Sequence, residues 1–535
     1  MKLAPLLLAF ALLSLSVYSH YTEEGLKCSH DSVDQNHEIV EIDEDVHPEG
    51  ERLLQELPQF RMAAGYDALD SAPASYKEYM QTELVPPVLD YFQAALKIKR
   101  PLTSKITISA SKVCSVPTPA ALKSGVVADF FVILDSAFDD ASSWVAESYS
   151  CYLASGTKRP YIGKTVFNRD LLKEPKGNIL LHEKNTYLFM HELIHTLGFS
   201  KSLYKYYLDV NGKVIPNPTK TVSLLGVDRM VLDIPVLTER ARNYFGCSNL
   251  EGVFLEDDGS SASYGSHLER RYFVMEHMTS GLMYTQRISE FTLGVLEATG
   301  WFVPDFSMAE PYYLGQGKGC GFFRDSCSAS SFDYEEYGYC KGSTWGCGTH
   351  GRGGGKCVGD TKSDNCRYTK PDVNYDCENP NADNYVRLPS LQTFGREAGS
   401  KCFTGTLSST SSSASTTSFC FKPTCSGSGS STKLVIKVGS QSVTCTKEGK
   451  VSVSGYRGTI DCPDPLTFCS TIGKPFCPRG CMGRGKCVNN KCECNKGFGG
   501  VDCGLFDPTN DGNNGGDDGN NDNGNGGSDC RRRRR

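Results

Sequence analysis

The sequence predicts an α+β fold over its first 305 residues, followed by a disulfide-rich region that is mainly β or irregular. Strand-like apolar runs at 106–108, 126–134 and 161–166 come before a helix that we expect over 185–197. Cysteine frequency then rises, and 13 of the 24 cysteines lie between Cys320 and Cys469, both included. In an oxidising compartment such cysteines form disulfides, so we expect bridges to hold the second half more than a large core does.

The first 55 residues predict targeting and processing segments. A leucine-rich run over 6–17 ends in small or apolar residues, which is the pattern of a signal peptide, assigned here to 1–19. Residues 20–55 are acidic and contain several histidines, and we expect a propeptide there. No other run reaches the length of a transmembrane helix, and the hydrophobic tail of a GPI signal is missing. These features predict a secreted protein without a visible anchor, for which surface association remains open.

A helix is also predicted within 60–100, because apolar residues from Tyr79 to Leu96 recur at helical spacing. Pro86 and Pro87 are expected to distort its middle. Cys114 and Cys151 flank the strand at 126–134 and are candidates to pair with each other. In the cysteine-rich part, 434–438 and 450–453 are candidate hairpin strands.

The most informative stretch is His191-Glu192-Leu193-Ile194-His195. Residues four apart share one face of a helix, so the two imidazoles can chelate one Zn²⁺ while Glu192 acts on a metal-bound water. Apolar residues around both turns predict a buried helix, with Asn185 and Thr186 as caps and Gly198 as a left-handed end. The alternative is a pair of surface histidines beside a solvated glutamate.

A catalytic zinc site takes three protein ligands and leaves one position for water. A thermolysin-like site would use a downstream glutamate, but none occurs from Thr196 to Thr238. A glycine three residues after the second histidine is typical of metzincins, whose compact pattern would place the third histidine where Lys201 stands. The third ligand must therefore come from further along, where the histidines are His267, His277 and His350.

The segment HELIHTLGFS, a long insertion, Gly265-Ser266-His267 and then Glu276-His277-Met278 resembles leishmanolysin, the metzincin group with an insert before its third histidine. The resemblance implies His191, His195 and His267 as ligands of one zinc ion, and Met278 as the apolar Met-turn under the metal. Taken alone, His267 could be a surface residue and Met278 a packing residue. His277 is a rival ligand.

The resemblance covers about residues 25–470 and implies a metzincin domain over 56–305. In that fold a twisted mixed sheet and the active-site helix lie over a lower subdomain. A helix with cap residues, predicted over 289–300, would pack under the Met-turn. A cysteine-rich extension would follow over 306–472.

The implied reaction is hydrolysis of peptide bonds in proteins or peptides by a zinc-dependent endopeptidase. Zinc polarises the scissile carbonyl and lowers the pKa of its water, for which Glu192 would be the general base and then the proton donor to the leaving amine. The sequence does not identify a second oxyanion donor, and Tyr272 and Tyr284 are guesses.

Cys28 lies in Lys27-Cys28-Ser29-His30-Asp31, which resembles the family's propeptide motif Cys-x-His-Asp. The resemblance implies a zymogen switch in which the thiolate occupies the open zinc position. An ordinary disulfide cysteine or a free thiol is the alternative. Setting Cys28 and Cys530 aside leaves 22 cysteines, an even number that can pair completely.

Six cysteines between Cys477 and Cys503 resemble an EGF-like module, assigned to 473–505. The resemblance implies three bridges, whereas spacing alone leaves fifteen pairings. The implied bridges are Cys477–Cys487, Cys481–Cys492 and Cys494–Cys503. The tail, 506–535, is rich in Asn, Gly and Asp and predicts disorder. With a net charge of −6 and only five terminal arginines, the chain lacks the basic surface that nucleic-acid binding requires.

Two functions from different classes follow. The first is a secreted zinc endopeptidase with an inhibitory propeptide, acting in proteolysis at the cell surface and in cell adhesion. The second is a catalytically silent secreted adhesion protein that binds through its EGF-like module. Loss of a ligand or of Glu192 would favour the second, and all of these residues are present.

Overall fold

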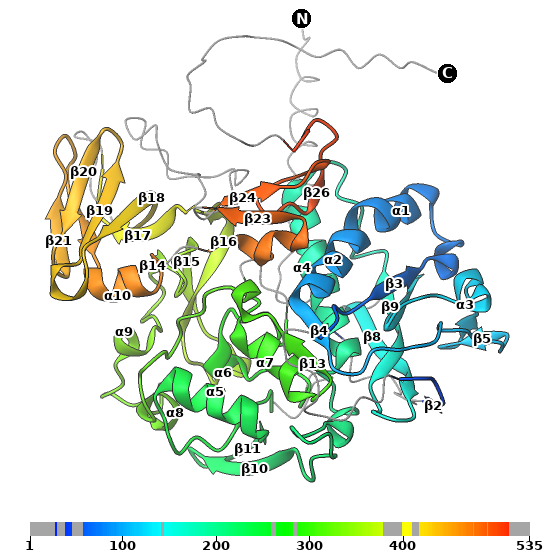
Figure 1. The fold of residues 1–535 in the computed structure, drawn as a ribbon. Helices are drawn as coiled ribbons and strands as arrows, with labels where there is room; N and C mark the ends of the chain where they lie inside the picture. The colour runs from blue at the N-terminus through cyan, green and yellow to red at the C-terminus, as the bar shows by residue number, and fades with distance from the viewer. Residues whose placement is uncertain are drawn as a thin grey trace, which may run out of the picture.

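The computed structural model describes residues 27–28, 38–44, 57–140, 144–257, 264–281, 286–377, 399–408, 417–473, 476–488 and 491–512 (Figure 1). The predicted signal peptide, most of the predicted tail, Tyr284 and Cys530 lie outside these residues. No helix within the described ranges combines the length and apolar character needed to cross a bilayer.

A six-stranded mixed sheet lies on the right side of the molecule, where β3, β8 and β9 are labelled (Figure 1). Its path runs through β1 (Lys27–Cys28), β8 (Trp144–Ala154), β9 (Pro160–Asn168), β7 (Phe130–Ala137) and β3 (Met62–Gly65), with β2 (Glu38–Val40) also beside β8. β8 is antiparallel to β9, and the other pairs are parallel. β1 and β2 both come from the predicted propeptide, so this segment contributes strands to the sheet.

The apolar residues of β7 divide between two cores because strand side chains alternate between faces. Phe130, Val132 and Leu134 join the main core, which also contains residues of α2 (Val85–Ala95) and α4 (Ile179–Leu197). Phe131 and Ile133 join a second core on the opposite face. A strand covered on both faces accounts for the continuous apolar run in the sequence.

Two strand predictions need correction. The strand expected at 126–134 begins at Phe130 and runs on to Ala137. The strand expected at 106–108 is wrong: Ile106 forms one isolated bridge with Val126. The N–H of Ile108 instead donates to the carbonyl of Leu122 in α3 (Ala120–Ser124), so the segment packs on a helix and has no partner strand. Between Ile108 and α3 the chain forms the short hairpin of β5 (Lys112–Val113) and β6 (Val116–Pro117).

The helix predicted within 60–100 is divided into α1 (Ala74–Tyr79), a π-helical turn (Met80–Leu84) and α2. The three segments follow one another without a break, and Pro86 and Pro87 lie just after the π turn, so the predicted distortion in the middle of the helix is confirmed. The irregularity that they impose lies just before them, in the wide π turn.

The motif helix α4 begins earlier than predicted. Asn178 is its cap, with a side chain that accepts a hydrogen bond of 3.1 Å from the N–H of Leu181. The predicted caps are wrong, because Asn185 and Thr186 are buried inside the helix. The Nδ2 of Asn185 donates to the phenol oxygen of Tyr79, which gives this polar residue a partner in the core.

The described residues within 219–304, called here the lower subdomain because they lie toward the bottom of Figure 1, form short helices and a small antiparallel sheet. Its elements are β10 (Thr219–Leu224), β11 (Val227–Leu232), α5 (Pro235–Phe245), β12 (Val253–Phe254), α6 (Arg270–Phe273), α7 (Glu290–Ala298) and β13 (Phe302–Pro304), which pairs with β4 (Leu96–Ile98). The capped helix predicted at 289–300 is confirmed as α7: Ser289 caps its start, and Gly300 follows its end with φ 77°.

The cysteine-rich region contains two further antiparallel sheets and short helices. They consist of α8 (Gly321–Arg324), α9 (Tyr334–Tyr337), β14 (Trp345–Cys347), β15 (Gly353–Val358), β16 (Tyr368–Asp376), β17 (Lys401–Gly405), β18 (Thr417–Ser426), β19 (Lys433–Val438), β20 (Gln441–Cys445), β21 (Gly449–Ser452), β22 (Thr459–Cys462) and α10 (Pro465–Ser470). The two candidate hairpin strands exist as β19 and β21, but they pair with β20 and β22 and not with each other. Besides its disulfides, the larger sheet has an apolar core of its own.

Eleven disulfides join cysteines from Cys114 to Cys503 in the described residues, including the expected pair Cys114–Cys151. The last three form a small unit, residues 476–488 and 491–512, called here the six-cysteine module. Its elements are a helical turn (Pro478–Gly483), β23 (Gly485–Val488), β24 (Lys491–Cys494), β25 (Phe498–Gly499) and β26 (Leu505–Phe506). Its bridges are Cys477–Cys487, Cys481–Cys492 and Cys494–Cys503.

Candidate metal centre

The helix α4 places His191 and His195 side by side in the protein interior. Both side chains are buried, because the helix is surrounded by the main core and the sheet. Glu192, the residue between them, is also buried. The helix ends at Leu197, and Gly198 has φ 160° and ψ −28°, so the predicted left-handed end is wrong. A glycine is required there for another reason: a Cβ would lie 2.7 Å from Cγ2 of Thr299.

His267 reaches the same point from the far end of the insertion. The backbone N–H of Lys201 donates to Oγ of Ser266 at 3.0 Å, and the phenol of Tyr204 donates to the carbonyl of Gly265 at 2.7 Å. The chain therefore leaves the helix and returns to it at one place. Lys201, where a compact metzincin would have its third histidine, lies beside the residue that precedes His267.

The three Nε2 atoms converge. His191 and His195 are 3.1 Å apart at Nε2, and His267 lies 3.1 Å from His191 and 3.2 Å from His195. These three residues form a group able to hold a metal ion. Two nitrogens bound to one zinc at about 2.0–2.1 Å with a tetrahedral angle would be roughly 3.3 Å apart, so the spacing fits the donor set of such a site.

Backbone carbonyls fix the proton of two of these rings. Nδ1 of His191 lies 2.9 Å from the carbonyl oxygen of His277, and Nδ1 of His195 lies 2.7 Å from that of Phe199. A carbonyl oxygen only accepts, so each Nδ1 carries the proton and each Nε2 presents a lone pair. Burial lowers the pKa of His191 to about 4, against the smaller effect of its hydrogen bond to His277, and the ring is neutral at pH 7. Neutral imidazoles with lone pairs that face one point suit a cation between them.

Met278 is fully buried, and the turn that carries it is held by the carboxylate of Glu276. This carboxylate accepts hydrogen bonds from the N–H of Met278 at 2.6 Å and from Oγ of Ser289 at 2.8 Å, and also from the hydroxyl of Thr292. Burial raises the pKa of Glu276, and these hydrogen bonds lower it in part. One side chain thus joins the turn at Met278, the predicted Met-turn, to the N-terminus of α7.

Sequence reasoning overlooked Glu276. The available signal was a glutamate just ahead of the His-Met pair, together with a serine-capped helix, α7, that has no capping glutamate at its third position. The turn is also tied to the third histidine, because the N–H of Leu268 donates to the carbonyl of Met278 at 2.8 Å.

The rival histidines do not join the group. The ring of His277 lies 5.7 Å from that of His191 and 5.6 Å from that of Tyr187, measured between centroids. Burial and the neighbouring charges lower its pKa well below the usual value. His350 packs against Tyr312 at 4.8 Å. The part of His277 that serves the site is its backbone carbonyl.

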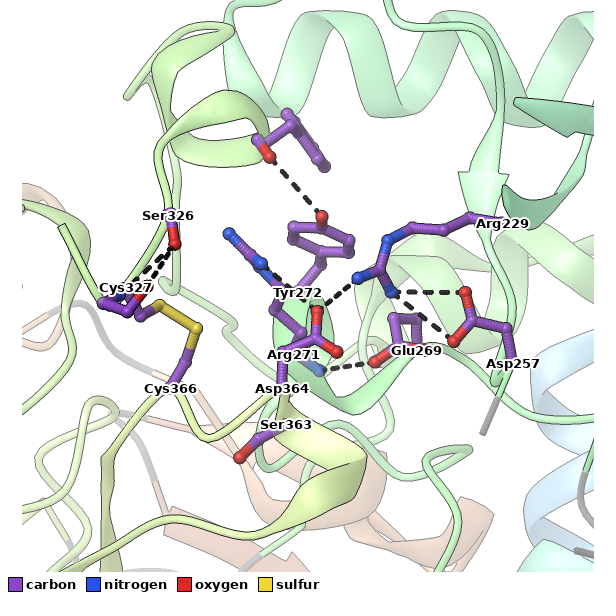
Figure 2. Close-up of polar contacts among 12 residues, drawn as sticks. Arg229, Asp257, Glu269, Arg271, Tyr272, Ser326, Cys327, Ser363, Asp364 and Cys366 are labelled. Atoms are coloured by element: carbon purple, nitrogen blue, oxygen red, sulfur yellow. Dashed lines mark hydrogen bonds and ion pairs between the residues drawn. A yellow bond between two sulfur atoms is a disulfide. The ribbon is translucent and has the colours of Figure 1, made fainter. Parts of the chain in front are cut away.

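A network of charged side chains begins two residues after His267, at Glu269 and Arg271 (Figure 2). Arg229 pairs with Asp257 at 3.2 Å and with Asp364, and Arg271 pairs with Asp364 at 3.2 Å. The N–H of Arg271 donates to the carboxylate of Glu269 at 3.1 Å. The network therefore connects the chain just after His267 to the cysteine-rich region, next to the Cys327–Cys366 disulfide.

The remaining candidate residues are Tyr272, Cys28 and Tyr284. Tyr272 turns its phenol toward the carbonyl of Phe323 at 3.5 Å, within the lower subdomain, so nothing supports it as an oxyanion donor (Figure 2). The backbone of Cys28 pairs with Ala146 on β8. Tyr284 lies outside the described residues.

The leishmanolysin family model matches residues 66–364. The chain is similar to a leishmanolysin-like peptidase of Caenorhabditis elegans, with 25% identity over 51% of this chain and 53% of that protein. It is also similar to a ciliated left-right organizer metallopeptidase of Danio rerio, with 28% identity over 59% of this chain and 51% of that protein. Leishmanolysin of Leishmania chagasi is 25% identical over 52% of this chain and 46% of its own length. The chain thus spans about half the length of these relatives.

Proposed function

The chain belongs to the leishmanolysin family, whose model covers residues 66–364 of its 535, and from this we propose that it is a zinc-dependent endopeptidase that hydrolyses peptide bonds in proteins. The observation that carries the proposal is the convergence of three buried histidine Nε2 atoms within 3.2 Å of one another. His191, His195 and His267 would hold one zinc ion. The substrates and the physiological target are not specified by this arrangement.

Zinc, when bound, supplies a Lewis acid for the substrate carbonyl and acidifies water. The chain's own residues supply the rest. The carbonyls of His277 and Phe199 keep the protons of His191 and His195 on Nδ1, so that both Nε2 atoms stay available. A carboxylate oxygen of Glu192, between the two ligands on α4, would take the proton from the attacking water and pass it to the leaving amine.

A substitution at Glu192 tests the proposal. Glu192→Ala should abolish cleavage of a quenched peptide library while one zinc ion per chain remains, and a chelator should abolish cleavage by the wild-type protein. His267→Ala should lose both zinc and activity. Substantial turnover by Glu192→Ala, or chelator-resistant cleavage, would reject the assignment.

We further propose that the N-terminal segment keeps the enzyme latent. β1 and β2 lie along the edge of β8, and the carboxylate of Glu44 accepts hydrogen bonds from the N–H of Thr157 at 2.9 Å and from its hydroxyl at 2.6 Å. These contacts support a docked propeptide, in which the thiolate of Cys28 would occupy the open position at the metal. A thiol-reactive mercurial should activate the precursor, and Cys28→Ser should lack latency. A Cys28→Ser precursor that stays silent would refute the switch.

We also propose secretion, since eleven disulfides in the described residues suit an oxidising compartment. Retention of the chain in the cytosol of its own cells would count against this. The adhesion alternative predicts a lost ligand or a lost Glu192. Because all four residues are present and buried together, we do not propose a catalytically silent protein.

A further inference from the structure

The six-cysteine module packs against the catalytic region near α2 and α4, although it lies beyond the residues that the family model matches (Figure 1). Met482 of the module belongs to the main apolar core. Gly480 and Gly483 lie so close to their neighbours that a Cβ would come within 2.6 Å of Met308 and 2.8 Å of Ala94. A spacer between domains would need no such fit.

Arg479 is the charged residue at the centre of the contact. Its side chain is 2% exposed, and its guanidinium pairs with Glu183 of α4 at 3.2 Å and with Asp502 of the module. It also lies over the ring of Tyr187, with Cζ 4.6 Å from the centroid. Glu183, Tyr187 and His191 are spaced four apart, so they share one face of α4. A single module side chain therefore contacts the two helical turns that come just before the first histidine.

The same part of the module also contacts the segment next to the Met-turn. The N–H of Arg479 donates to Oε1 of Glu310 at 3.2 Å, and Glu310 pairs with Arg287 at 3.6 Å. The guanidinium of Arg287 lies over the ring of Phe476, the first described residue of the module. The carbonyl of Arg287 accepts the N–H of His277 at 2.8 Å. The module thus reaches both segments that build the metal site.

The backbone at this point is unusual. Arg479, Gly480, Cys481 and Met482 have φ between 48° and 55°, which makes a left-handed turn. Residues other than glycine avoid this conformation, because Cβ approaches the next carbonyl, and it persists only where surrounding contacts fix it. The Cys481–Cys492 disulfide and the burial of Arg479 and Met482 supply such contacts.

We propose that the six-cysteine module is a clamp on the metal centre, with Arg479 as the positioning residue that holds α4 against the Met-turn. The proposal rests on the function proposed above, because it names what keeps that site assembled. The hydrogen bond from Nδ1 of His191 to the carbonyl of His277 crosses between these two segments. A shift of one segment against the other would lengthen it and release the ring of His191.

The test compares Arg479→Met with Arg484→Met in the full chain. Arg484 lies in the same stretch of the module, but it pairs with Asp90 of α2 at 2.7 Å and stacks on Phe498 of the module itself. Two quantities are measured: zinc affinity by competition with a chelator, and hydrogen exchange of the amides of 183–198 and 275–289 in metal-free protein.

Groups that orient metal ligands typically change metal affinity or activity by about 10–100-fold when they are lost. We expect Arg479→Met to lose zinc affinity in that range, to speed exchange in both segments and to lower kcat more than it raises KM. Arg479→Lys should recover part of each effect because it keeps the charge. Arg484→Met should keep zinc affinity within about twofold of wild type.

Equal effects of Arg479→Met and Arg484→Met would overturn the proposal, since the module would then only add stability. Unchanged zinc affinity and exchange in Arg479→Met would also overturn it. If Arg479→Met does not fold, Arg479→Lys and Glu183→Gln carry the same measurements with smaller changes. If the wild-type protein lacks zinc-dependent cleavage, the proposed function fails, whereas exchange in the metal-free protein still decides whether the clamp exists.

Discussion

The carboxylate of Glu276 offers the sharpest quantitative test of how the site is held. Its two oxygens accept two backbone N–H groups, from Met278 at 2.6 Å and from Ser289 at 3.3 Å, on different oxygens. Glu276→Gln replaces one oxygen with an NH₂ group, which cannot accept. Whichever way the glutamine amide is oriented, the backbone N–H of either Met278 or Ser289 faces its NH₂ group and loses its acceptor. This loss is the same whether the native carboxyl is ionised or neutral.

The loss of unfolding free energy in Glu276→Gln follows from this one N–H without an acceptor. A buried N–H left without an acceptor costs roughly 1–3 kcal/mol, so we expect Glu276→Gln to lose about 2–3 kcal/mol of unfolding free energy in metal-free protein. The matched control is Glu290→Gln at the start of α7, whose partly exposed ion pair with Arg240 at 3.4 Å should contribute less than about 1 kcal/mol. Because the Met-turn carries the carbonyl of His277, zinc affinity should also fall in Glu276→Gln, by about 10-fold or more.

The assay is denaturant unfolding of both variants without metal, followed by competition for zinc with a chelator. Loss of stability without loss of zinc affinity would show that the turn does not orient His191. Stability within about 0.5 kcal/mol of wild type would refute the hydrogen-bond count itself, since a surface substitution does as much.

Three further outcomes are expected. His277→Phe should keep one zinc ion per chain by elemental analysis, whereas loss of zinc equal to that in His267→Phe would make His277 a ligand. Gly198→Ala should lower the unfolding free energy by about 1–3 kcal/mol in denaturant titration, because its Cβ would lie 2.7 Å from Thr299, and an unchanged midpoint would show that the helix end can relax. Burial raises the pKa of Asp360, but the charge of Arg270, 2.8 Å away, and hydrogen bonds outweigh it, so the net pKa is lowered. A depressed folded pKa gives stability that is present above the unfolded value, about 3.9, and lost as pH falls through the folded one. Asp360→Asn should therefore lose less stability than wild type between about pH 4 and 2, measured as denaturation midpoints, and parallel curves would contradict this.

The two histidines of α4 could be predicted because their spacing is a local property of a helix. His267 could not be derived in that way. Its approach depends on the contact between Lys201 and Ser266, across 65 residues, and only the resemblance to a family pointed to it. The start of α4 was missed because its apolar pattern weakens before Tyr187, whereas Asn178 caps it through a single side chain. The strand expected at 106–108 failed because Ile106 and Ile108 are buried in the core between α3 and the second face of the sheet, without adding a strand to that sheet.

Contacts between distant parts of the chain were beyond sequence reasoning altogether. Glu183 and Arg479 are 296 residues apart, and neither belongs to a recognisable metal motif. The sequence predicted only an adhesion role for the six-cysteine module, because its cysteine spacing describes only its own fold. Nothing in that spacing encodes the surface against which the module packs.

The contacts that orient the ligands of this site are made by the backbone. The rings of His191 and His195 are oriented by backbone carbonyls, which no side-chain substitution at those positions can remove. The geometry of the site therefore depends on where two pieces of backbone lie: the end of α4 and the Met-turn. Gly198 permits the end of α4 to approach Thr299 closely, and Glu276 fixes the Met-turn to α7. Residues without any contact to a metal should then govern metal affinity, and they should do so in proportion to how firmly they hold those two backbone segments together.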